Sequence, residues 1–520
     1  MKDLLVGIDI GTTSTKAIVC DAQGTVLAEA SQEYPTHYPH PNWAEQDPED
    51  WWRATCFVLR EIFGKQGVDA QRIAGISVSA QAPTVVAVDS SGRPLTMAQL
   101  WLDRRSDAEC AWLAETIGEE AIASINGGRI DPYYFAPKLL WSKRHDFSNY
   151  QITNTFLLCN GYIVHKLTNA FSLDLSQGPL SLCFDSVNLR WSEKLLEQMG
   201  LDAAKLPPIH PCSEIVGEVT SEAAAATGLL AGTPVVAGAC DGTAAALEAG
   251  IVDVGDAVEM TGQSTVLLIS SERPYLGNLL IPLVHAVPGR YLTIGATVAS
   301  GGALRWFRDT LWHSPNTPIP QLPSSEENKG TGNSVIRNPF DQMTALAATS
   351  PIGANRLIFL PYLYGERSPI WDSDARGVFF GLSLATTQAD MIRAVMEGAA
   401  FALRHNVEAA AAGGFPLKSL GCVGGGAKSA LWNQIKADVL NRPLTLPKVG
   451  VGAPLGDAMI AAAGVGLYPS VEAAVQAMVS RGETYWPNAE AVEKYEKLYQ
   501  VYVGLYPALR ESFGGLAVFS

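Results

Sequence analysis

The stretch LLVGIDIGTTSTKAIVCDAQGTVLAEA, residues 4–30, decides the fold class. Its first two apolar runs are separated by the polar turn 11–13, and the turn 21–24 leads into a third run. Apolar and β-branched runs separated by Gly, Thr and Asp are typical of antiparallel hairpins. We therefore predict two consecutive hairpins at the start of the chain.

Helical and strand patterns alternate after these hairpins. Residues 48–63 carry apolar side chains at helical spacing after the start signal Asp47-Pro48. Strand character returns in IAGISVSAQ at 73–81 and in TVVAVDSSG at 84–92. Alternating strands and helices predict an α/β protein.

The opening pattern recurs in the second half. DAVEMTGQSTVLLISS at 256–271 again reads as strand, Gly-containing turn and strand, and its turn 262–264 lies about 251 residues after 11–13. Two copies of one device, each at the start of a half, predict a duplicated fold with a cleft between two lobes. The boundary falls near 250–256, which divides the chain into 1–250 and 251–520. The stretch 314–334, rich in Pro, Ser, Asn and Gly, is predicted to be a loop excursion.

Charge and composition exclude several classes of function. The 520 residues include 37 Lys and Arg against 52 Asp and Glu, a formal net charge of −15 without a basic block. This balance argues against nucleic acid and against anionic membrane surfaces as partners. No apolar run is long enough for a membrane span, and the eight scattered cysteines form no C-x-x-C pair. We expect a cytoplasmic protein.

The first turn has the chemistry of a phosphate site. Asp9 ends an apolar run, and Gly11, Thr12 and Thr13 follow it. Backbone N–H groups of such a turn can hold phosphate oxygens, and Asp9 can hold hydrated Mg²⁺. An ordinary polar hairpin turn is the alternative. The partner turn Gly262-Gln263-Ser264 favours the phosphate interpretation.

A second carboxylate, Asp241, follows the apolar run 234–239 and precedes small residues of helical character. It suits either the N-cap of a helix or a general base that accepts a hydroxyl proton at the mouth of the cleft. The segment itself does not decide between these roles.

Three further segments remain open on their own residues. The Gly-rich stretch 421–429 departs from a P-loop because Ala427 separates Gly426 from Lys428, so nucleotide approach and tight packing are equally compatible with it. The segment 101–105 (WLDRR) is suited either to a polyhydroxylated ligand or to a surface ion-pair cluster. Residues 365–369 (GERSP) suit either a site or a structural turn with an ion pair.

Taken together, these segments resemble the FGGY family of carbohydrate kinases, within the actin, hexokinase and Hsp70 superfamily. The resemblance runs from Gly7 to about Gly466. YFAPKLLW at 134–141 is similar to the first family signature. GVFFGL at 377–382, with DM at 390–391 and AVME at 394–397, is similar to the second.

The resemblance implies two actin-like (ribonuclease H-like) lobes with mixed sheets around an active-site cleft. It implies a sugar site and the base in 1–250, and ATP in 251–520, which ends in a helical tail. Asp241 would be the catalytic base, and Asp9 with Asp241 would be associated with Mg²⁺. A homodimer is a family-level expectation. The implied nucleotide-binding residues are Gly11, Thr12, Thr13, Lys16, Gly262, Gln263, Ser264, Gly301, Arg305, Gly425, Gly426 and Ala427. The implied sugar-binding residues are Gln81, Ala82, Pro83, Trp101, Asp103, Arg104 and Asp241.

The order of motifs within the family implies phosphorylation of a small ketose at a terminal hydroxyl, D-xylulose in the first place. One position departs from the relatives with that substrate, which usually read Gln-Met-His where this chain reads Gln81-Ala82-Pro83. The hydrogen bonds of that His to substrate hydroxyls would be missing, and such bonds discriminate strongly between substrates. Another pentulose, a polyol, a sugar acid or glycerol therefore stays open as acceptor, as do a non-catalytic actin-fold ATPase and a sugar-binding regulator.

Overall fold

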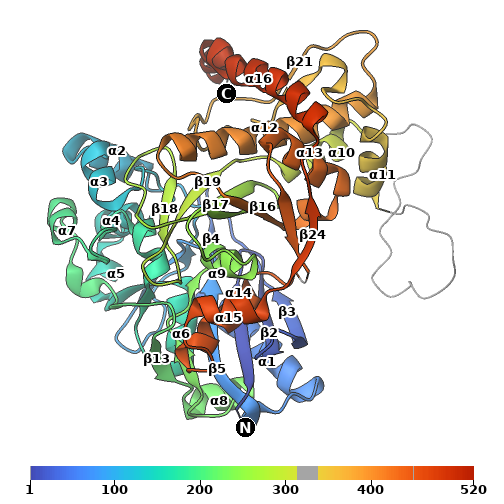
Figure 1. Ribbon diagram of the computed structural model, residues 1–520. Coiled ribbons are helices and arrows are strands. Elements are labelled where there is room, and N and C mark those ends of the chain that lie inside the picture. The colour runs from blue at the N-terminus through green and yellow to red at the C-terminus, as the bar shows by residue number, and fades with distance from the viewer. Residues whose placement is uncertain (1, 313–337, 449, 520) are drawn as a thin grey trace.

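A computed structural model describes residues 2–312, 338–448 and 450–519 (Figure 1). The predicted excursion 314–334 lies outside the described residues. The chain forms two lobes, each built around a seven-stranded mixed sheet, with helices packed on both (Figure 1).

The first sheet begins with the two predicted hairpins. β1 (Leu4–Ile10) pairs antiparallel with β2 (Ser14–Asp21), which pairs antiparallel with β3 (Val26–Glu33). On the other side of β1, β5 (Ile73–Ala80) runs parallel to it. The remaining strands beyond β5 are β14 (Pro234–Val236), β13 (Ile215–Glu218) and β15 (Ala239–Cys240). The hairpin prediction is confirmed.

The second sheet repeats this order and direction. β16 (Asp256–Thr261) pairs antiparallel with β17 (Thr265–Ser271) and parallel with β22 (Ser419–Val423). The outer strands are β19 (Tyr291–Ala296) and β18 (Ile281–Val284) beyond β17, and β23 (Leu444–Pro447) and β24 (Arg481–Tyr485) beyond β22. The prediction of a duplicated α/β fold is confirmed, because β3-β2-β1-β5-β14 matches β19-β17-β16-β22-β23.

Helices cover both faces of the first sheet. Leu4, Val6 and Ile8 pack into one apolar core with α1 (Pro48–Arg60) and α6 (Cys159–Thr168). Leu5, which points to the opposite face, packs with α14 (Ala453–Gly464). α1 begins where the sequence predicts, since the Asp47 side chain accepts from the Glu49 N–H and Pro48 opens the first turn. The α-helix ends at Arg60, and a π-helical turn continues to Lys65.

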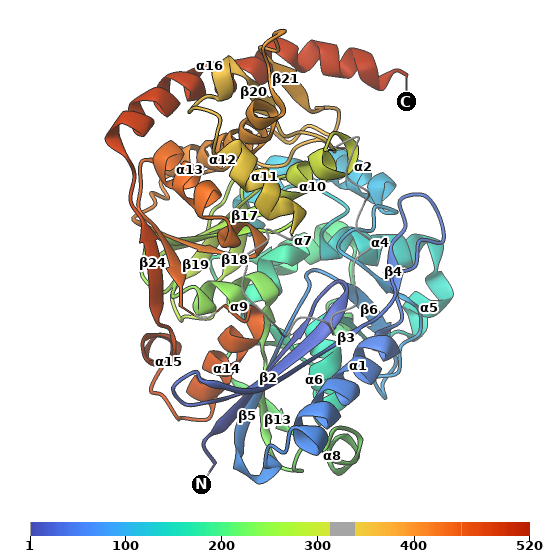
Figure 2. The ribbon, with the colours of Figure 1, turned by 90° about the vertical axis from the view of Figure 1, so that its right-hand side faces the viewer.

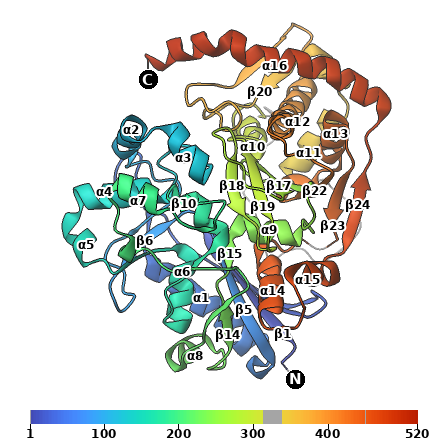
Figure 3. The same cartoon turned by 60° about the vertical axis from the view of Figure 1, so that its left-hand side comes forward.

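Two helices lie between the sheets, α9 (Asp241–Glu248) and α14, as the views in Figures 1 and 3 agree. α14 comes from the second half of the chain yet packs on β1 and β5 of the first sheet. This packing is very close, because a Cβ on Gly7 would lie 1.8 Å from the Pro454 carbonyl oxygen. A Cβ on Gly456 would lie 1.9 Å from the Ala244 carbonyl oxygen. The first lobe therefore needs a segment from the far end of the sequence.

α12 (Gln388–Ala412) and α13 (Ala430–Leu440) pack on the second sheet, and α10 (Gly301–Thr310) packs on α12. α12 starts at a capping box formed by Thr387 and Asp390. The helical tail is α16 (Ala489–Ala517), which runs along the outer end of this lobe (Figure 2).

An insertion in the first lobe carries a small four-stranded sheet and several helices. Its strands are β4 (Glu45–Gln46), β7 (Ala98–Gln99), β6 (Val85–Val88) and β8 (Thr155–Leu158). Its helices include α2 (Asp107–Thr116), α3 (Glu119–Asn126), α4 (Phe135–His145) and α5 (Phe147–Ile152). Across the described parts of the chain, no helix has both the length and the apolarity to cross a lipid bilayer.

Candidate active site

The two polar turns hold the same place in the two sheets. Residues 11–13, which we call the first turn, join β1 to β2, and residues 262–264, the second turn, join β16 to β17. The first is closed by a hydrogen bond from the Gly11 N–H to the Ser14 carbonyl, 3.0 Å. The second is closed by the Gly262 N–H and the Ser264 carbonyl, 2.8 Å. Both turns leave backbone groups accessible, so both can accept an anionic ligand.

Two carboxylates lie beside the first turn. Asp9 is the second-last residue of β1, and Asp241 opens α9. Burial, and next the negative charge of Asp241, raise the pKa of Asp9 to about 7, while the nearby Lys16 opposes the rise. Burial also raises the pKa of Asp241, whose Oδ1 accepts from the Gly242 N–H at 2.6 Å. Both groups thus hold a proton more readily than an exposed Asp does.

A third carboxylate, Asp457 of α14, stands behind this pair. It is fully buried, and its oxygens contact Ser79 Oγ at 2.6 Å and Ser77 Oγ at 3.1 Å. Burial raises the pKa of Asp457 well above its ordinary value. Ser79 Oγ also lies 3.3 Å from Asp9 Oδ1, so it links the two carboxyl groups. Asp457 could not be predicted from local sequence, because its partners are more than 370 residues away along the chain.

The donor set beside the first turn fits a Mg²⁺ ion that keeps much of its water. Within residues 2–312, 338–448 and 450–519, no group of three or more His, Cys, Asp or Glu side chains could hold a metal. Mg²⁺ usually binds through one or two carboxylates and substrate phosphates, without a full protein cage. Asp9 and Asp241 supply such a pair, and a divalent cation would offset the repulsion from Asp241 that adds to burial in raising the pKa of Asp9.

The second turn is enclosed by glycine-rich backbone from two other segments. A Cβ on Gly301, at the start of α10, would lie 2.1 Å from the Gly262 carbonyl oxygen. A Cβ on Gly424 would lie 2.7 Å from the Thr261 carbonyl oxygen. Most of the predicted nucleotide-binding residues of this lobe therefore come together: Gly262, Gln263, Ser264, Gly301, Gly425, Gly426 and Ala427. Arg305 lies farther along α10, and its side chain is exposed.

A buried ion pair supports this region from below. Lys436 of α13 bonds Glu259 of β16, and both side chains are at most 2% exposed. Lys436 Nζ also donates to Thr261 Oγ1 at 3.2 Å, and Thr261 Oγ1 donates to the free oxygen of Glu259 at 2.6 Å. The pair ties the strand before the second turn to the helix after the Gly-rich stretch 421–429. Sequence reasoning missed it, because Lys436 lies 177 residues from Glu259.

An aromatic group faces the first turn. Trp101 Nε1 donates to Thr12 Oγ1 at 3.1 Å, and its ring meets that of Tyr133 edge to face with centroids 6.3 Å apart. The Tyr133 hydroxyl donates to the Ala82 carbonyl at 2.8 Å. Gln81 is almost fully buried, and its Oε1 has no hydrogen-bond partner among the described residues. Trp101 and the segment 81–83 thus lie near the first turn.

Asp103 and Arg104 are placed differently from Trp101. Asp103 is fully buried, and its oxygens accept from the Ala44 N–H at 2.7 Å and from the Arg105 guanidinium at 2.6 and 2.8 Å. Arg104 is half exposed and pairs with Asp131 at 3.0 Å. The structure therefore uses Asp103 to anchor the segment that carries Trp101, and it does not turn these two side chains toward Asp241.

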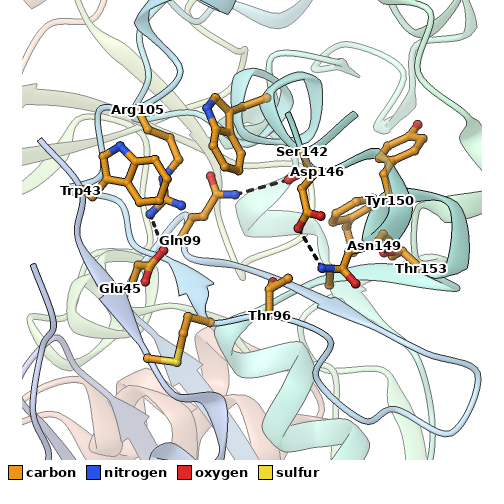
Figure 4. A pocket seen from close by; sticks show the side chains of 14 residues that line it. Trp43, Glu45, Thr96, Gln99, Arg105, Ser142, Asp146, Asn149, Tyr150 and Thr153 are labelled. Atoms are coloured by element: carbon orange, nitrogen blue, oxygen red, sulfur yellow. Dashed lines mark hydrogen bonds and ion pairs between the residues drawn. The ribbon is translucent and has the colours of Figure 1, made fainter. Parts of the chain in front are cut away.

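A hollow of about 200 Å³ lies on the far side of this anchor (Figure 4). Arg105 stacks on Trp43, with its Cζ 3.6 Å from the ring centroid, and pairs with Glu45 at 2.7 Å. Gln99 donates to Ser142, as the dashed line in Figure 4 shows. None of the predicted site residues lines this hollow. Its polar groups are largely paired with one another.

The segment 365–369 of the second lobe lies close to the Trp101 ring of the first lobe. Glu366 is buried, and its Oε1 accepts from the N–H groups of Val298 and Arg367, both at 2.8 Å. Burial raises the pKa of Glu366 to about 8. The Arg367 guanidinium carbon lies 5.7 Å from the Trp101 ring centroid, so a second-lobe side chain meets the aromatic group of the first lobe.

Comparisons with known proteins agree across nearly the whole chain. Residues 4–248 match the model of the N-terminal domain of the FGGY family of carbohydrate kinases, and residues 257–465 match its C-terminal domain. A xylulose kinase of Staphylococcus epidermidis (strain ATCC 12228) is 32% identical over 514 residues, 98% of each chain. A gluconokinase of Bacillus subtilis (strain 168) is 28% identical over 525 residues, 99% of this chain and 98% of the relative. The crystal structure of xylulose kinase from Rhodospirillum rubrum is 33% identical with a TM-score of 0.88, covering 98% of this chain and 100% of that one.

Proposed function

The chain belongs to the FGGY family of carbohydrate kinases, and we propose that it transfers the γ-phosphoryl group of ATP to the terminal 5-hydroxyl of D-xylulose. The observation that carries this proposal is the pair Asp9 and Asp241 beside the first turn, with the second turn held in the matching place of the other lobe. The full-length similarity to xylulose kinases supports the acceptor.

Asp241 is the general base of the proposed reaction. Burial raises its pKa, which makes the ionised carboxylate a stronger base than an exposed Asp. It accepts the proton of the attacking hydroxyl as the oxygen bonds to the γ-phosphorus and the bond to the β-phosphate oxygen breaks. In such transfers, catalysis depends on positioning and on neutralising charge.

The two turns hold the phosphates of ATP in this proposal. Gly11, Thr12 and Thr13 supply N–H and hydroxyl donors from the first lobe, with Lys16 close by, and Gly262, Gln263 and Ser264 supply them from the second. Asp9 and Asp241 would hold Mg²⁺, which supplies charge neutralisation between phosphates and carboxylates when bound. Residues 1–250 would carry the acceptor site and 251–520 the nucleotide, with α14 returning to the first lobe.

The adenosine is proposed to lie against the backbone around the second turn. Gly301 and Arg305 would border it on one side, and Gly425, Gly426 and Ala427 on the other. The absence of side chains at the glycines supports this, because a nucleotide can approach their backbone closely. The buried pair of Lys436 and Glu259 would keep these surfaces in register without touching the nucleotide.

The acceptor is proposed to lie on Trp101, with Gln81, Ala82 and Pro83 beside it. Gln81 Oε1, which has no hydrogen-bond partner among the described residues, would accept a hydrogen bond from a sugar hydroxyl. Asp103 would act by fixing the position of Trp101, and Arg104 would pair with Asp131 in the same support.

A sugar acid is the second candidate acceptor. Pro83 offers no hydrogen bond where relatives acting on D-xylulose usually have His, and the Bacillus subtilis gluconokinase is similar over 99% of this chain. A carboxylate acceptor would need a cation nearby, and Arg367 faces Trp101.

A coupled assay of ADP release over a panel of acceptors tests the proposal. The panel contains D-xylulose, other ketoses, polyols, glycerol and gluconate, with ATP and Mg²⁺ constant and a reaction without acceptor as the control. The proposal expects the highest kcat/KM with D-xylulose. A higher value with gluconate would select the second candidate, and slow ADP release that no acceptor stimulates would contradict kinase function.

A further inference from the structure

We propose that Arg367 completes the acceptor site from the opposite lobe, where its guanidinium donates hydrogen bonds to oxygens of the acceptor sugar or of the phosphoryl group that the sugar receives. This inference rests on the proposed function and adds to it a binding residue from the second lobe. The segment 365–369 around it was suited, from the sequence, to either a site or a structural turn.

The position of Arg367 supports a role in the site. Its guanidinium carbon lies 5.7 Å from the centroid of the Trp101 ring, while Trp101 Nε1 donates to Thr12 of the first turn. The ring of Tyr133 meets the Trp101 ring, and the pKa of Tyr133 responds to charges from both lobes. Burial raises its pKa most, Arg367 opposes the rise and Asp241 adds to it. The charges of Arg367 and Asp241 thus act in opposite directions on the pKa of the same tyrosine.

The guanidinium of Arg367 has no carboxylate partner among the described residues. No Asp or Glu oxygen of residues 2–312, 338–448 and 450–519 lies within 4.0 Å of it, although the side chain is partly buried. Other buried arginines are paired: Arg105 with Asp103 at 2.6 Å, and Arg393 with Glu397 at 2.7 Å. An arginine carries five N–H donors in a planar fork that matches phosphate and carboxylate oxygens. An unpaired guanidinium at this place has donors available for a ligand.

The backbone on both sides of Arg367 is firmly attached to the second lobe. Glu366 Oε1 accepts from the Val298 N–H at 2.8 Å, and Ser368 Oγ accepts from the Ala296 N–H at 2.6 Å. Between these residues, Thr297 Oγ1 accepts from the N–H of Thr265, which directly follows the second turn, at 3.1 Å. Arg367 is thus fixed relative to the second turn while its side chain reaches the first lobe. Glu366 is a positioning residue in this arrangement.

The charge balance of the site gives Arg367 its chemical purpose. Asp9 and Asp241 repel an incoming phosphoryl group unless positive charge lies nearby. A bidentate guanidinium stabilises phosphate oxygens strongly, and a Lys ammonium, as a point charge, reproduces that geometry less well. The residue would therefore act as charge neutraliser and as orienting donor at once.

The test compares Arg367→Met, Arg367→Lys and Arg376→Met with the wild type. Arg376, nine residues after Arg367, is the matched control. Its guanidinium donates to the carbonyls of Ser373 and Ala375. It lies beside Leu516 and Phe519 at the end of α16. We expect Arg367→Met to lower kcat/KM for the acceptor by about 10²–10³-fold, the usual loss when one preorganised donor is removed. Arg367→Lys should recover part of this, and Arg376→Met should match the wild type.

The separate effects on kcat and on the acceptor KM show whether Arg367 binds oxygens of the phosphoryl group or of the sugar. A fall in kcat at unchanged acceptor KM assigns Arg367 to the phosphoryl group, and a rise in KM at unchanged kcat assigns it to the sugar. The Kd of ATP without acceptor should stay within about twofold, because Arg367 is placed on the acceptor side. Added guanidinium ion should restore part of the activity of Arg367→Ala, which a purely structural role would not explain.

Wild-type kinetics in a folded Arg367→Met variant would overturn the proposal, as would an equal loss of ATP affinity without acceptor. Thermal unfolding of each variant shows whether it is folded, and the Lys variant and the guanidinium rescue keep the test decisive if Met proves destabilising. The wild type in the same assay separates this inference from the proposed function. Its own failure with every acceptor contradicts the kinase proposal, whereas normal wild-type turnover with unaffected variants contradicts only the role of Arg367.

Discussion

The first and second turns share one backbone design but have opposite surroundings. Each joins the first two antiparallel strands of its sheet, and each is closed by a short backbone hydrogen bond. Two residues before the glycine, the first copy has Asp9 and the second has Met260. One residue earlier, the first copy buries the apolar Ile8, and the second buries Glu259 in an ion pair with Lys436.

This difference indicates that the two copies of the duplicated fold have different roles. The first turn lies beside carboxylates with raised pKa values that have no cation in direct ion-pair contact among the described residues. At the second turn the buried charge is neutralised internally, and the surface is glycine backbone. Unpaired charge suits chemistry, and internally paired charge suits a rigid platform. We infer that the first copy performs the transfer and the second holds the nucleotide.

The largest difference in rate between the two copies is expected from substitutions at the equivalent positions Asp9 and Met260. Asp9→Asn should lower kcat by about 10²–10³-fold, because one preorganised charged group is lost from the site. Met260→Leu, the matched change in the second copy, should stay near the wild-type rate because a volume-conserving apolar swap is well tolerated. Steady-state ADP release with acceptor measures both. Similar losses of kcat in the two variants would contradict the inference that the two copies have different roles.

A second effect concerns stability, and it compares the lysines of the two copies. Lys436→Met should lower the free energy of unfolding by about 3–5 kcal/mol, because it leaves Glu259 buried without its counter-ion. Lys16→Met, on the exposed side of β2, should change it by less than about 0.5 kcal/mol. Urea unfolding measures both, and the KM for ATP should rise for Lys436→Met.

The double variant Lys436→Met with Glu259→Met is the control for this explanation. Replacing both partners by apolar residues removes the unpaired charge, so stability should return toward the wild-type value. If the double variant is as unstable as Lys436→Met, the pair is not held by charge compensation, and its role as a neutralised platform fails.

The last expected effect is on the pH dependence of the free energy of unfolding, and it concerns the buried carboxyl of Glu366 in the second lobe. The pKa of Glu366 is raised to about 8 in the folded protein from an ordinary value of 4.5, so the folded state keeps a proton that the unfolded chain releases. Its contribution to stability is present at low pH and declines as pH rises between these values. Glu366→Gln should flatten the profile between these pH values, because the Gln amide has no titratable proton. Chemical unfolding at several pH values tests this, with the exposed Glu222→Gln as the unaffected control.

The sequence predicted the frame well because local patterns determine it. The hairpins of 4–30, the repeated turn at 262–264 and the alternation of strands and helices all follow from residues close together in the chain. α1 begins at Pro48 as its start signal indicates. The duplicated order of the two sheets then follows from two copies of one pattern.

Contacts between distant segments were beyond local patterns. Nothing near Lys436 or Asp457 indicates that their partners lie on strands far along the chain. The packing of α14 on the first sheet was missed for the same reason, although the small residues Gly7 and Gly456 were a sign of close approach.

Side-chain direction was the other limit. Trp101 and Asp103 are two residues apart, yet Trp101 contacts the first turn while Asp103 is buried under Arg105. Arg367 could not be distinguished from a paired arginine in a turn, because its lack of a carboxylate partner among the described residues depends on how the lobes meet.

The most direct test of the central claim is the rate of acceptor-dependent ADP release by Asp241→Asn, measured together with its ATP affinity and its thermal unfolding. If Asp241 is the general base, the variant should fold, bind ATP like the wild type and lose about 10²–10⁴-fold in kcat, the range for removal of a general base. A folded Asp241→Asn variant that phosphorylates the acceptor at a rate close to the wild type would contradict it.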